Sequence, residues 1–233
     1  MRRGFLSLFF RFLQTGFFLG ASVGCSVRAL LCEQLGLDEE YVLQRITTIF
    51  LDGKPVDDID SAIVRDGATL SLSAAMPGLV GAAMRRGGAF ASLRSSITAN
   101  KRDVSVSRGA GFIRLKLFNM VMRELGPEFL KKGVVIRSPE LVDFFKEQPE
   151  AFWQRVPMIG LNGAAVDRRM LTDGVLSLSA AEALPPGTPG YPRSGSWVRA
   201  TGHPGAPAKR VEGVPFSDWM TLSVVSDSEE HCP

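Results

Sequence analysis

The chain has little of what conventional active sites are built from. Among its 233 residues it holds only two histidines, His203 and His231, and three cysteines, Cys25, Cys32 and Cys232. Both histidines lie in a C-terminal stretch rich in proline and glycine, where we expect no general base to be held within reach of a substrate. The cysteines are odd in number and lack the spacing of a metal site or a disulfide framework. These shortages predict a protein without cofactor, metal or catalytic activity, in a reducing, cytoplasmic setting.

Other functional signals are also missing. The sequence contains no P-loop, nucleophile elbow, paired-cysteine motif or His-x-x-x-His pair. A net charge of +3 is too small to indicate nucleic-acid binding. The apolar run over residues 5–20 is interrupted by Arg11 and is too short to span a bilayer. Because residues 4–8 (GFLSL) have a counterpart at 111–115 (GFIRL), we expect this run to be a strand of the fold and not an export signal.

What the chain does have is an internal repeat. Residues 45–53 (RITTIFLDG) recur as residues 155–163 (RVPMIGLNG). Each copy then reaches an Asp-Gly pair and an identical LSLSAA hexapeptide, within residues 66–75 and 173–181. A duplicated unit of this length predicts two domains with one fold.

The second copy shows its secondary-structure pattern most clearly. The apolar residues of 113–117 alternate with Arg114 and Lys116, which is typical of a half-buried strand. Residues 123–132, which include Gly126-Pro127, are expected to form a connection. The sequence Ser-Pro-Glu at 138–140 predicts the N-cap and first turn of a helix. Further strands are expected at 133–136, 156–161 and 175–179.

The first copy follows the same order. We expect a hairpin of two strands, a helix, a strand ending in the turn Asp52-Gly53, and a last strand. Both copies therefore predict β-β-α-β-β, an α+β fold in which one helix covers one face of a small mixed sheet. The corresponding ranges are 5–12 and 16–23 for the hairpin, 26–35 for the helix, and 46–51 and 69–73 for the later strands.

Composition sets the expected boundaries. Domain 1 should span residues 4–84 and domain 2 residues 111–183, with a basic linker over 85–110. Residues 184–233 form a tail rich in proline and glycine that lacks apolar periodicity, so we expect it to be disordered. Within that tail, only residues 211–225 have the apolar content to dock onto a domain or a partner.

This order of elements, with Leu161-Asn162-Gly163 after the third strand and Asp173-Gly174 before the last, resembles the small β-grasp sulfur carriers. These are the ubiquitin-like proteins of the ThiS type and the molybdopterin-synthase small subunit. The resemblance implies two tandem β-grasp domains. Carriers of this family act through a free C-terminal Gly-Gly, which is activated and converted to a thiocarboxylate. Here the second copy continues as Gly187-Thr188-Pro189-Gly190, and Gly87-Gly88 of the first copy is joined to Ala89.

Three functions follow from these observations. The first, which we favour, is a non-catalytic adaptor that binds another protein through the uncharged segment 74–84, although a loop packed against the second copy explains that segment equally well. The second is a sulfur-carrier or ubiquitin-like modifier precursor cut after Gly88, for which a flexible hinge is the simpler explanation of the glycine pair. The third is an anion-binding linker, against which the shortage of aromatic residues favours a solvated segment. The residues concerned are Met76, Pro77, Leu79, Val80 and Met84 for the partner, Gly87 and Gly88 for processing, and Arg85, Arg86, Lys101 and Arg102 for anions.

One acidic run could be mistaken for a metal site. Asp57, Asp58 and Asp60 lie close together, but the run lacks the glycine and the distal glutamate of a calcium loop. We expect these residues to solvate a turn and cap a short helix.

Overall fold

The computed structural model describes two compact units. Unit 2 comprises Leu13–Glu124 and Gly190–Val211. Unit 1 comprises Met1–Phe12, Leu125–Pro189 and Glu212–Pro233. Both units combine helices with strands, which is consistent with the predicted α+β class. The described residues are 7–94, 98, 108–154, 156, 158–161, 164–166, 171 and 219–225.

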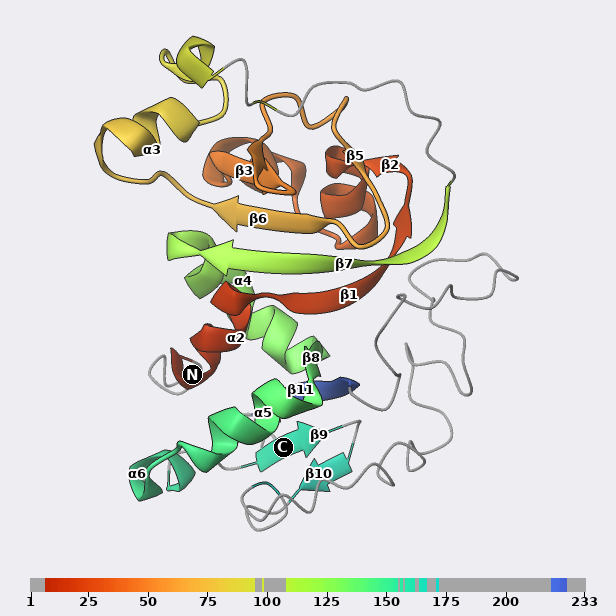
Figure 1. The fold of residues 1–233 in the computed structure, drawn as a ribbon, viewed down its shortest axis with the longest axis vertical. Coiled ribbons are helices and arrows are strands. Elements are labelled where there is room, and N and C mark those ends of the chain that lie inside the picture. The colour runs from red at the N-terminus through yellow and green to blue at the C-terminus, as the bar shows by residue number, and fades with distance from the viewer. Residues whose placement is uncertain are drawn as a thin grey trace, which may run out of the picture. The chain divides into compact units, whose positions relative to one another are not determined.

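Unit 2 is built on a mixed sheet with the strand order β1-β7-β6-β3-β4 (Figure 1). β7 (Gly109–Phe118) lies inside this sheet, antiparallel to β1 (Phe17–Val23) and parallel to β6 (Thr69–Ser73). β6 in turn pairs antiparallel with β3 (Thr48–Leu51), which forms a hairpin with β4 (Lys54–Pro55). A strand that opens the second sequence copy therefore completes the sheet of the first copy.

The alternation of residues in β7 explains its central position. Ile113, Leu115 and Leu117 are fully buried, while Arg114 and Lys116 between them are partly exposed. A central strand pairs with a neighbour along each edge and packs a row of apolar side chains into the core, as β7 does. The strand predicted over residues 113–117 is confirmed, and so is the strand at 69–73.

The turn predicted at Asp52-Gly53 is also confirmed. Both residues have positive φ, 50° for Asp52 and 76° for Gly53, as a two-residue hairpin turn between twisted strands requires. The Asp52 carboxylate accepts a hydrogen bond from the backbone N–H of Thr69 at 2.8 Å. The turn is thereby tied to the start of β6.

Helical segments and one short strand pair complete unit 2. The helix predicted over residues 26–35 is present as η2 (Ala29–Gln34), and Gly36 follows it with a φ of +69°. Leu30 and Leu31 bury its apolar face. The other elements are β2 (Cys25–Ser26), paired with β5 (Ile63–Val64), and η3 (Tyr41–Arg45), α3 (Gly78–Met84) and η4 (Ala91–Arg94).

Unit 1 contains an antiparallel sheet with the order β10-β9-β11-β8. β11 (Trp219–Val225) lies within the tail that we expected to be disordered, so that prediction is wrong for these seven residues. The hairpin β9 (Met158–Leu161) and β10 (Ala164–Val166) corresponds to the third strand of the second copy and the turn after it. Unit 1 also contains β8 (Val134–Arg137), α5 (Ser138–Lys146) and α6 (Glu150–Trp153).

The expected hairpin at the N-terminus is wrong. Its second strand exists as β1, but η1 (Ser7–Phe9) and α2 (Phe10–Thr15) are helical where the first strand was predicted. Phe9 and Phe12 are three positions apart and both buried, which is the spacing of one helix face. In unit 1 their rings lie 5.9 Å and 4.6 Å from that of Phe144. This aromatic contact favours a helix over a strand here.

The expected connection at residues 123–132 is wrong as well, because α4 (Asn119–Lys132) is helical throughout and has Pro127 inside it. The helix tolerates this proline although its ring nitrogen cannot donate a backbone hydrogen bond. α5 starts at Ser138, so its N-cap is Arg137 and not the predicted serine. Pro139 lies in its first turn, as predicted.

The compact units do not follow the boundaries that the repeat suggests. β7 belongs to unit 2 although it opens the second copy, and α4 begins in unit 2 and continues into unit 1. The last strand predicted at 175–179 and most of the tail lie outside the described residues. Among the helices of the described residues, none has the length and apolar character needed to cross a membrane.

Candidate functional site

The uncharged segment predicted to meet a partner forms α3 and the residues before it. Leu79 and Val80 on α3 are 71% and 69% exposed, more than any other large apolar side chain in the described residues. Pro77 is exposed too, whereas Met76 and Met84 are half-buried. The structure therefore places three of the five predicted partner-binding residues on the surface.

At Gly81, α3 packs closely against the residues that precede the helix. Gly81 is buried, and a Cβ built on it would lie 2.1 Å from the carbonyl oxygen of Met76. Gly78 starts the helix with a φ of +80°, a conformation that glycine adopts without strain. These two glycines allow the tight approach that turns the outer face of α3 toward solvent.

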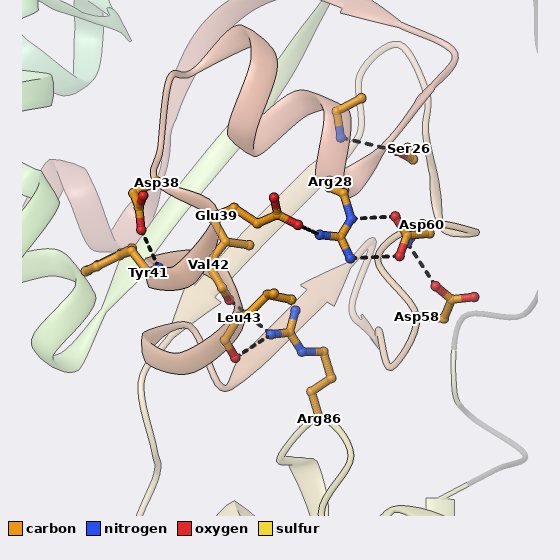
Figure 2. A network of polar contacts seen from close by, with 11 residues as sticks. Ser26, Arg28, Asp38, Glu39, Tyr41, Val42, Leu43, Asp58, Asp60 and Arg86 are labelled. Carbon is orange, nitrogen blue, oxygen red and sulfur yellow. Dashed lines mark hydrogen bonds and ion pairs between the residues drawn. The ribbon is translucent and has the colours of Figure 1, made fainter.

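Arg86 anchors the chain at the end of α3. Its backbone N–H donates to the carbonyl oxygen of Thr47 at 2.8 Å. Its guanidinium Nη2 donates to the carbonyl oxygens of Val42 and Leu43, both at 3.0 Å, in the last turn of η3 (Figure 2). A cation suits this position because carbonyl groups at a helix C-terminus carry partial negative charge. Burial lowers the pKa of Arg86, and the nearby positive charge of Arg28 lowers it further.

A second anchor is the ion pair between Arg94, which is buried, and Asp57, which is partly exposed. Nη2 and Nη1 of Arg94 lie 2.7 Å and 2.9 Å from Oδ1 and Oδ2 of Asp57, a two-bonded geometry. Arg94 also donates to the carbonyl oxygens of Ala83 at 2.5 Å and Arg85 at 3.2 Å, and to Oγ1 of Thr98 at 3.0 Å. We expected Arg94 to lie in a solvated linker, and this prediction is wrong because the residue is buried.

The glycine pair lies between these two anchors. Gly87 has a φ of +62°, and its backbone N–H is 3.5 Å from Oδ1 of Asp57. Gly88 donates to the carbonyl oxygen of Arg85 at 3.1 Å and accepts from the backbone N–H of Ala91 at 2.9 Å. Gly87-Gly88 therefore forms a hydrogen-bonded turn between α3 and η4.

The acidic run is used for structural contacts. Oδ1 of Asp58 accepts from the backbone N–H groups of Asp60 and Ser61 at 2.9 Å and 3.3 Å, which is the turn-capping role that we predicted. Asp60 forms two hydrogen bonds with Arg28, at 2.5 Å and 2.9 Å, and Arg28 also pairs with Glu39 (Figure 2). The hydrogen bonds with Asp60 raise the pKa of Arg28, and they lower the pKa of Asp60.

The described residues contain no group of three histidine, cysteine or acidic side chains that could hold a metal ion. Cys25 and Cys32 are free thiols, and the Sγ of Cys25 donates to the carbonyl oxygen of Ser22 at 3.2 Å. Burial raises the pKa of the Cys25 thiol, so it stays protonated near neutral pH and is a poor nucleophile. Lys101, Arg102 and both histidines lie outside the described residues.

Comparison with known proteins adds no family to this description. No protein-family model, curated protein or solved structure matches the chain. The function must therefore be argued from α3 and the contacts that hold it.

Proposed function

We propose that this protein is a non-catalytic interaction module that presents α3 to a partner protein. The exposure of Leu79 and Val80, 71% and 69%, carries this proposal. Arg86 and Arg94 hold the chain directly after α3 through partly buried hydrogen bonds. A surface fixed in this way loses little conformational entropy on binding, which favours its use as a recognition site.

The composition of this surface indicates the kind of partner. Leu79 and Val80 would fill an apolar pocket, and such buried anchors supply most of the binding energy in protein interfaces. Arg85, at the end of α3, is exposed and has a positive charge. We therefore propose a partner protein with an apolar pocket and an acidic rim.

We further propose that unit 2 is a β-grasp domain. In this domain β7, which comes after the unit's other strands in sequence, takes the place of the first strand of the β-grasp fold. In a β-grasp sheet the opening and closing strands lie parallel at the centre, with antiparallel neighbours on both sides. β7 and β6 are parallel, with β1 and β3 as antiparallel neighbours, which supports this assignment. Unit 1 repeats the order strand, helix, hairpin in β8, α5, β9 and β10, so we extend the proposal to a second β-grasp domain.

The alternative, a sulfur-carrier or modifier precursor cut after Gly88, has less support. Such a tail must be extended and free at its carboxyl end, whereas Gly88 makes two backbone hydrogen bonds within a turn. Intact mass spectrometry of the protein from its native cells separates the two functions. A fragment that ends at Gly88 would overturn the adaptor proposal.

A site-specific photo-crosslinker tests the adaptor proposal directly. Placed at Leu79, it should give one crosslinked protein in native cells, and placed at Leu43, an apolar residue 45% exposed on η3, it should not give that product. The protein identified should then bind the purified chain. Leu79→Asp should weaken this binding by at least about tenfold, with Leu43→Asp as the matched control. Equal affinities for the wild type and Leu79→Asp would overturn the proposal.

A further inference from the structure

The sheet of unit 2 has a buried face and a partly exposed face. Residues that pair across neighbouring strands lie on the same face, so the pairing registers assign each side chain to one of the two. The buried face consists of core residues, among them Ile49, Leu70, Leu72, Ile113, Leu115 and Leu117. On the opposite face six partly exposed side chains lie near one another, and we call them the aromatic-basic face. They are Phe18, Phe50, Thr69, Ser71, Arg114 and Lys116.

The aromatic-basic face consists of two rows that cross the strands in the order β1-β7-β6-β3 (Figure 1). One row contains Phe18, Arg114 and Thr69. The next row contains Lys116, Ser71 and Phe50. Each row therefore combines an aromatic ring, a cation and a hydroxyl group. The two rings belong to β1 and β3, which are three strand spacings apart, so their positions on the sheet are separated by at least about 14 Å.

The two cations lie side by side where β1 begins. A Cβ built on Gly16 would lie 2.7 Å from Nε of Arg114 and 3.0 Å from Cγ of Lys116. Both basic side chains therefore pass over Gly16, which leaves room for them because it has no side chain. The guanidinium carbon of Arg114 also lies over the ring of Phe18, 5.5 Å from its centroid, which is the geometry of a cation–π contact.

The sheet provides no acidic side chain to balance these charges. The strands β1, β3, β4, β6 and β7 contain no aspartate or glutamate. Within the described residues, neither Arg114 nor Lys116 forms an ion pair. Nε of Arg114 is buried and has no hydrogen-bond partner in this part of the chain. Two neighbouring positive charges without a counter-charge attract an anion.

We infer that the aromatic-basic face binds single-stranded nucleic acid. The two cations pair with backbone phosphates and the two rings stack with bases, the contacts that hold single strands on protein surfaces. Thr69 and Ser71 supply hydroxyl groups for hydrogen bonds to the sugars and phosphates. The separation of the rings requires several nucleotides, so one mononucleotide cannot reach both. A duplex fits less well, because its bases are already stacked on one another.

The composition of this face favours nucleic acid over an acidic segment of a protein. Both would match the two cations, but only the nucleic acid places a flat base against each ring while its phosphates meet the charges. The small total charge of +3 does not reveal this face, because it sums acids and bases over the whole chain. α3 is not part of this sheet and its proposed partner is a protein, so the inference stands or fails independently of the proposed function.

The first test measures binding of the full-length chain to fluorescent oligo(dT) and oligo(U) strands of about twelve nucleotides. Fluorescence anisotropy at several salt concentrations gives the affinity and its salt dependence. Lys116→Gln should weaken binding at least about fivefold at low salt, and should reduce the slope of log K against log salt by about 0.7. Absence of binding at about 100 μM protein in low salt would overturn the inference.

Lys54→Gln is the matched control for this charge change. Lys54 lies on β4 of the same sheet, and it pairs with Leu51, so it belongs to the other face. Its substitution removes the same charge and should change the affinity by less than about twofold. Equal losses of affinity in Lys54→Gln and Lys116→Gln would overturn the inference, because binding would then follow the total charge and not this face.

The rings distinguish nucleic acid from other polyanions. Phe18→Leu should weaken binding of the single strands at least about fivefold, whereas Phe18→Tyr keeps a ring and should bind as the wild type does. Polyphosphate, which has charge but no bases, should bind Phe18→Leu and the wild type equally. Thermal unfolding midpoints show whether each variant is folded, and the Lys116→Gln comparison decides the test if Phe18→Leu is not.

Two further outcomes would overturn the inference. Equal affinities of the wild type and a folded Phe18→Leu for the single strands would show that the face attracts anions without recognising bases. Tighter binding of polyglutamate than of either strand would identify an acidic protein segment as the better ligand.

Discussion

Arg94 and Asp57 form an ion pair that is buried on one side only. The Arg94 side chain is 3% exposed and that of Asp57 is 33% exposed. The pair joins η4 to the chain between β4 and β5, and so holds the residues that follow α3. Its asymmetry has a measurable consequence for the stability of the protein.

Removing the carboxylate should cost more than removing the guanidinium. Asp57→Ala leaves a buried, unpaired charge on Arg94, and we expect it to lower the free energy of unfolding by about 3 kcal/mol. Arg94→Met removes that charge and leaves Asp57 access to water, so we expect a loss of about 1–2 kcal/mol. Urea unfolding of both variants and of the double variant measures these costs. If the double variant is less stable than Asp57→Ala alone, this account of the pair is wrong.

The position of β7 in the sheet of unit 2 can be tested at two glycines. A Cβ on Gly111 would lie 2.6 Å from Oδ1 of Asp66, which accepts the backbone hydrogen bond of Phe112 at 2.8 Å. Gly109, on the same strand, has no atom within 4 Å of its Cβ position. Gly111→Ala should therefore destabilise the protein by about 1–2 kcal/mol, and Gly109→Ala should change stability by less than about 0.5 kcal/mol. Equal thermal unfolding midpoints for the two variants would contradict the placement of β7.

Local chemistry explains which elements could be predicted from the sequence. Residues 69–73 and 113–117 alternate strictly, and Asp52-Gly53 combines two residues that tolerate positive φ, so each pattern has one simple structural solution. The N-terminal run is different because nearly all of residues 5–13 are apolar. Such a run fits the period of a strand and that of a helix, and contacts with distant aromatic residues such as Phe144 and Phe152 favour the helix.

Long-range pairing explains what could not be predicted. The alternation of β7 reveals a strand but does not show that it pairs with β1 and β6 of the first copy. Arg94 and Asp57 are 37 positions apart, and no sequence spacing connects them. The apolar content of residues 211–225 did indicate a docking segment, but the identity of its neighbours, β8 and β9, depends on the fold.

The close packing of α3 against the preceding residues gives a prediction at Gly81. Because its Cβ would overlap the Met76 carbonyl, Gly81→Ala must displace α3 from the preceding chain. We expect a loss of about 1–3 kcal/mol in the free energy of unfolding, as for other overpacked sites, and faster tryptic cleavage at Arg85. Gly20→Ala, on β1 with no atom within 4 Å of the Cβ position, is the matched control. An unchanged rate of cleavage at Arg85 in Gly81→Ala would show that α3 does not pack against Met76.

The acid dependence of stability should report on Glu124. Its carboxylate accepts from Nε of Arg45 at 3.0 Å and from the hydroxyl of Tyr41 at 2.8 Å. Hydrogen bonding to Arg45 lowers the pKa of Glu124 below its ordinary value of 4.5, with a further contribution from Tyr41. A carboxyl group with a lower pKa in the folded state stabilises the protein above its unfolded pKa, and this contribution is lost as pH falls through the folded pKa.

The wild type should therefore be more stable than Glu124→Gln at neutral pH, by a margin that stays constant down to about pH 5. Below the unfolded pKa the margin should shrink, because the unfolded chain then binds a proton that the folded chain resists. Urea unfolding of both proteins between pH 3 and pH 7 measures it. Tyr41→Phe, which keeps the contact with Arg45, should retain most of this pH dependence. A margin that is the same at pH 3 as at pH 7 would show that the ionised carboxylate contributes nothing through these bonds.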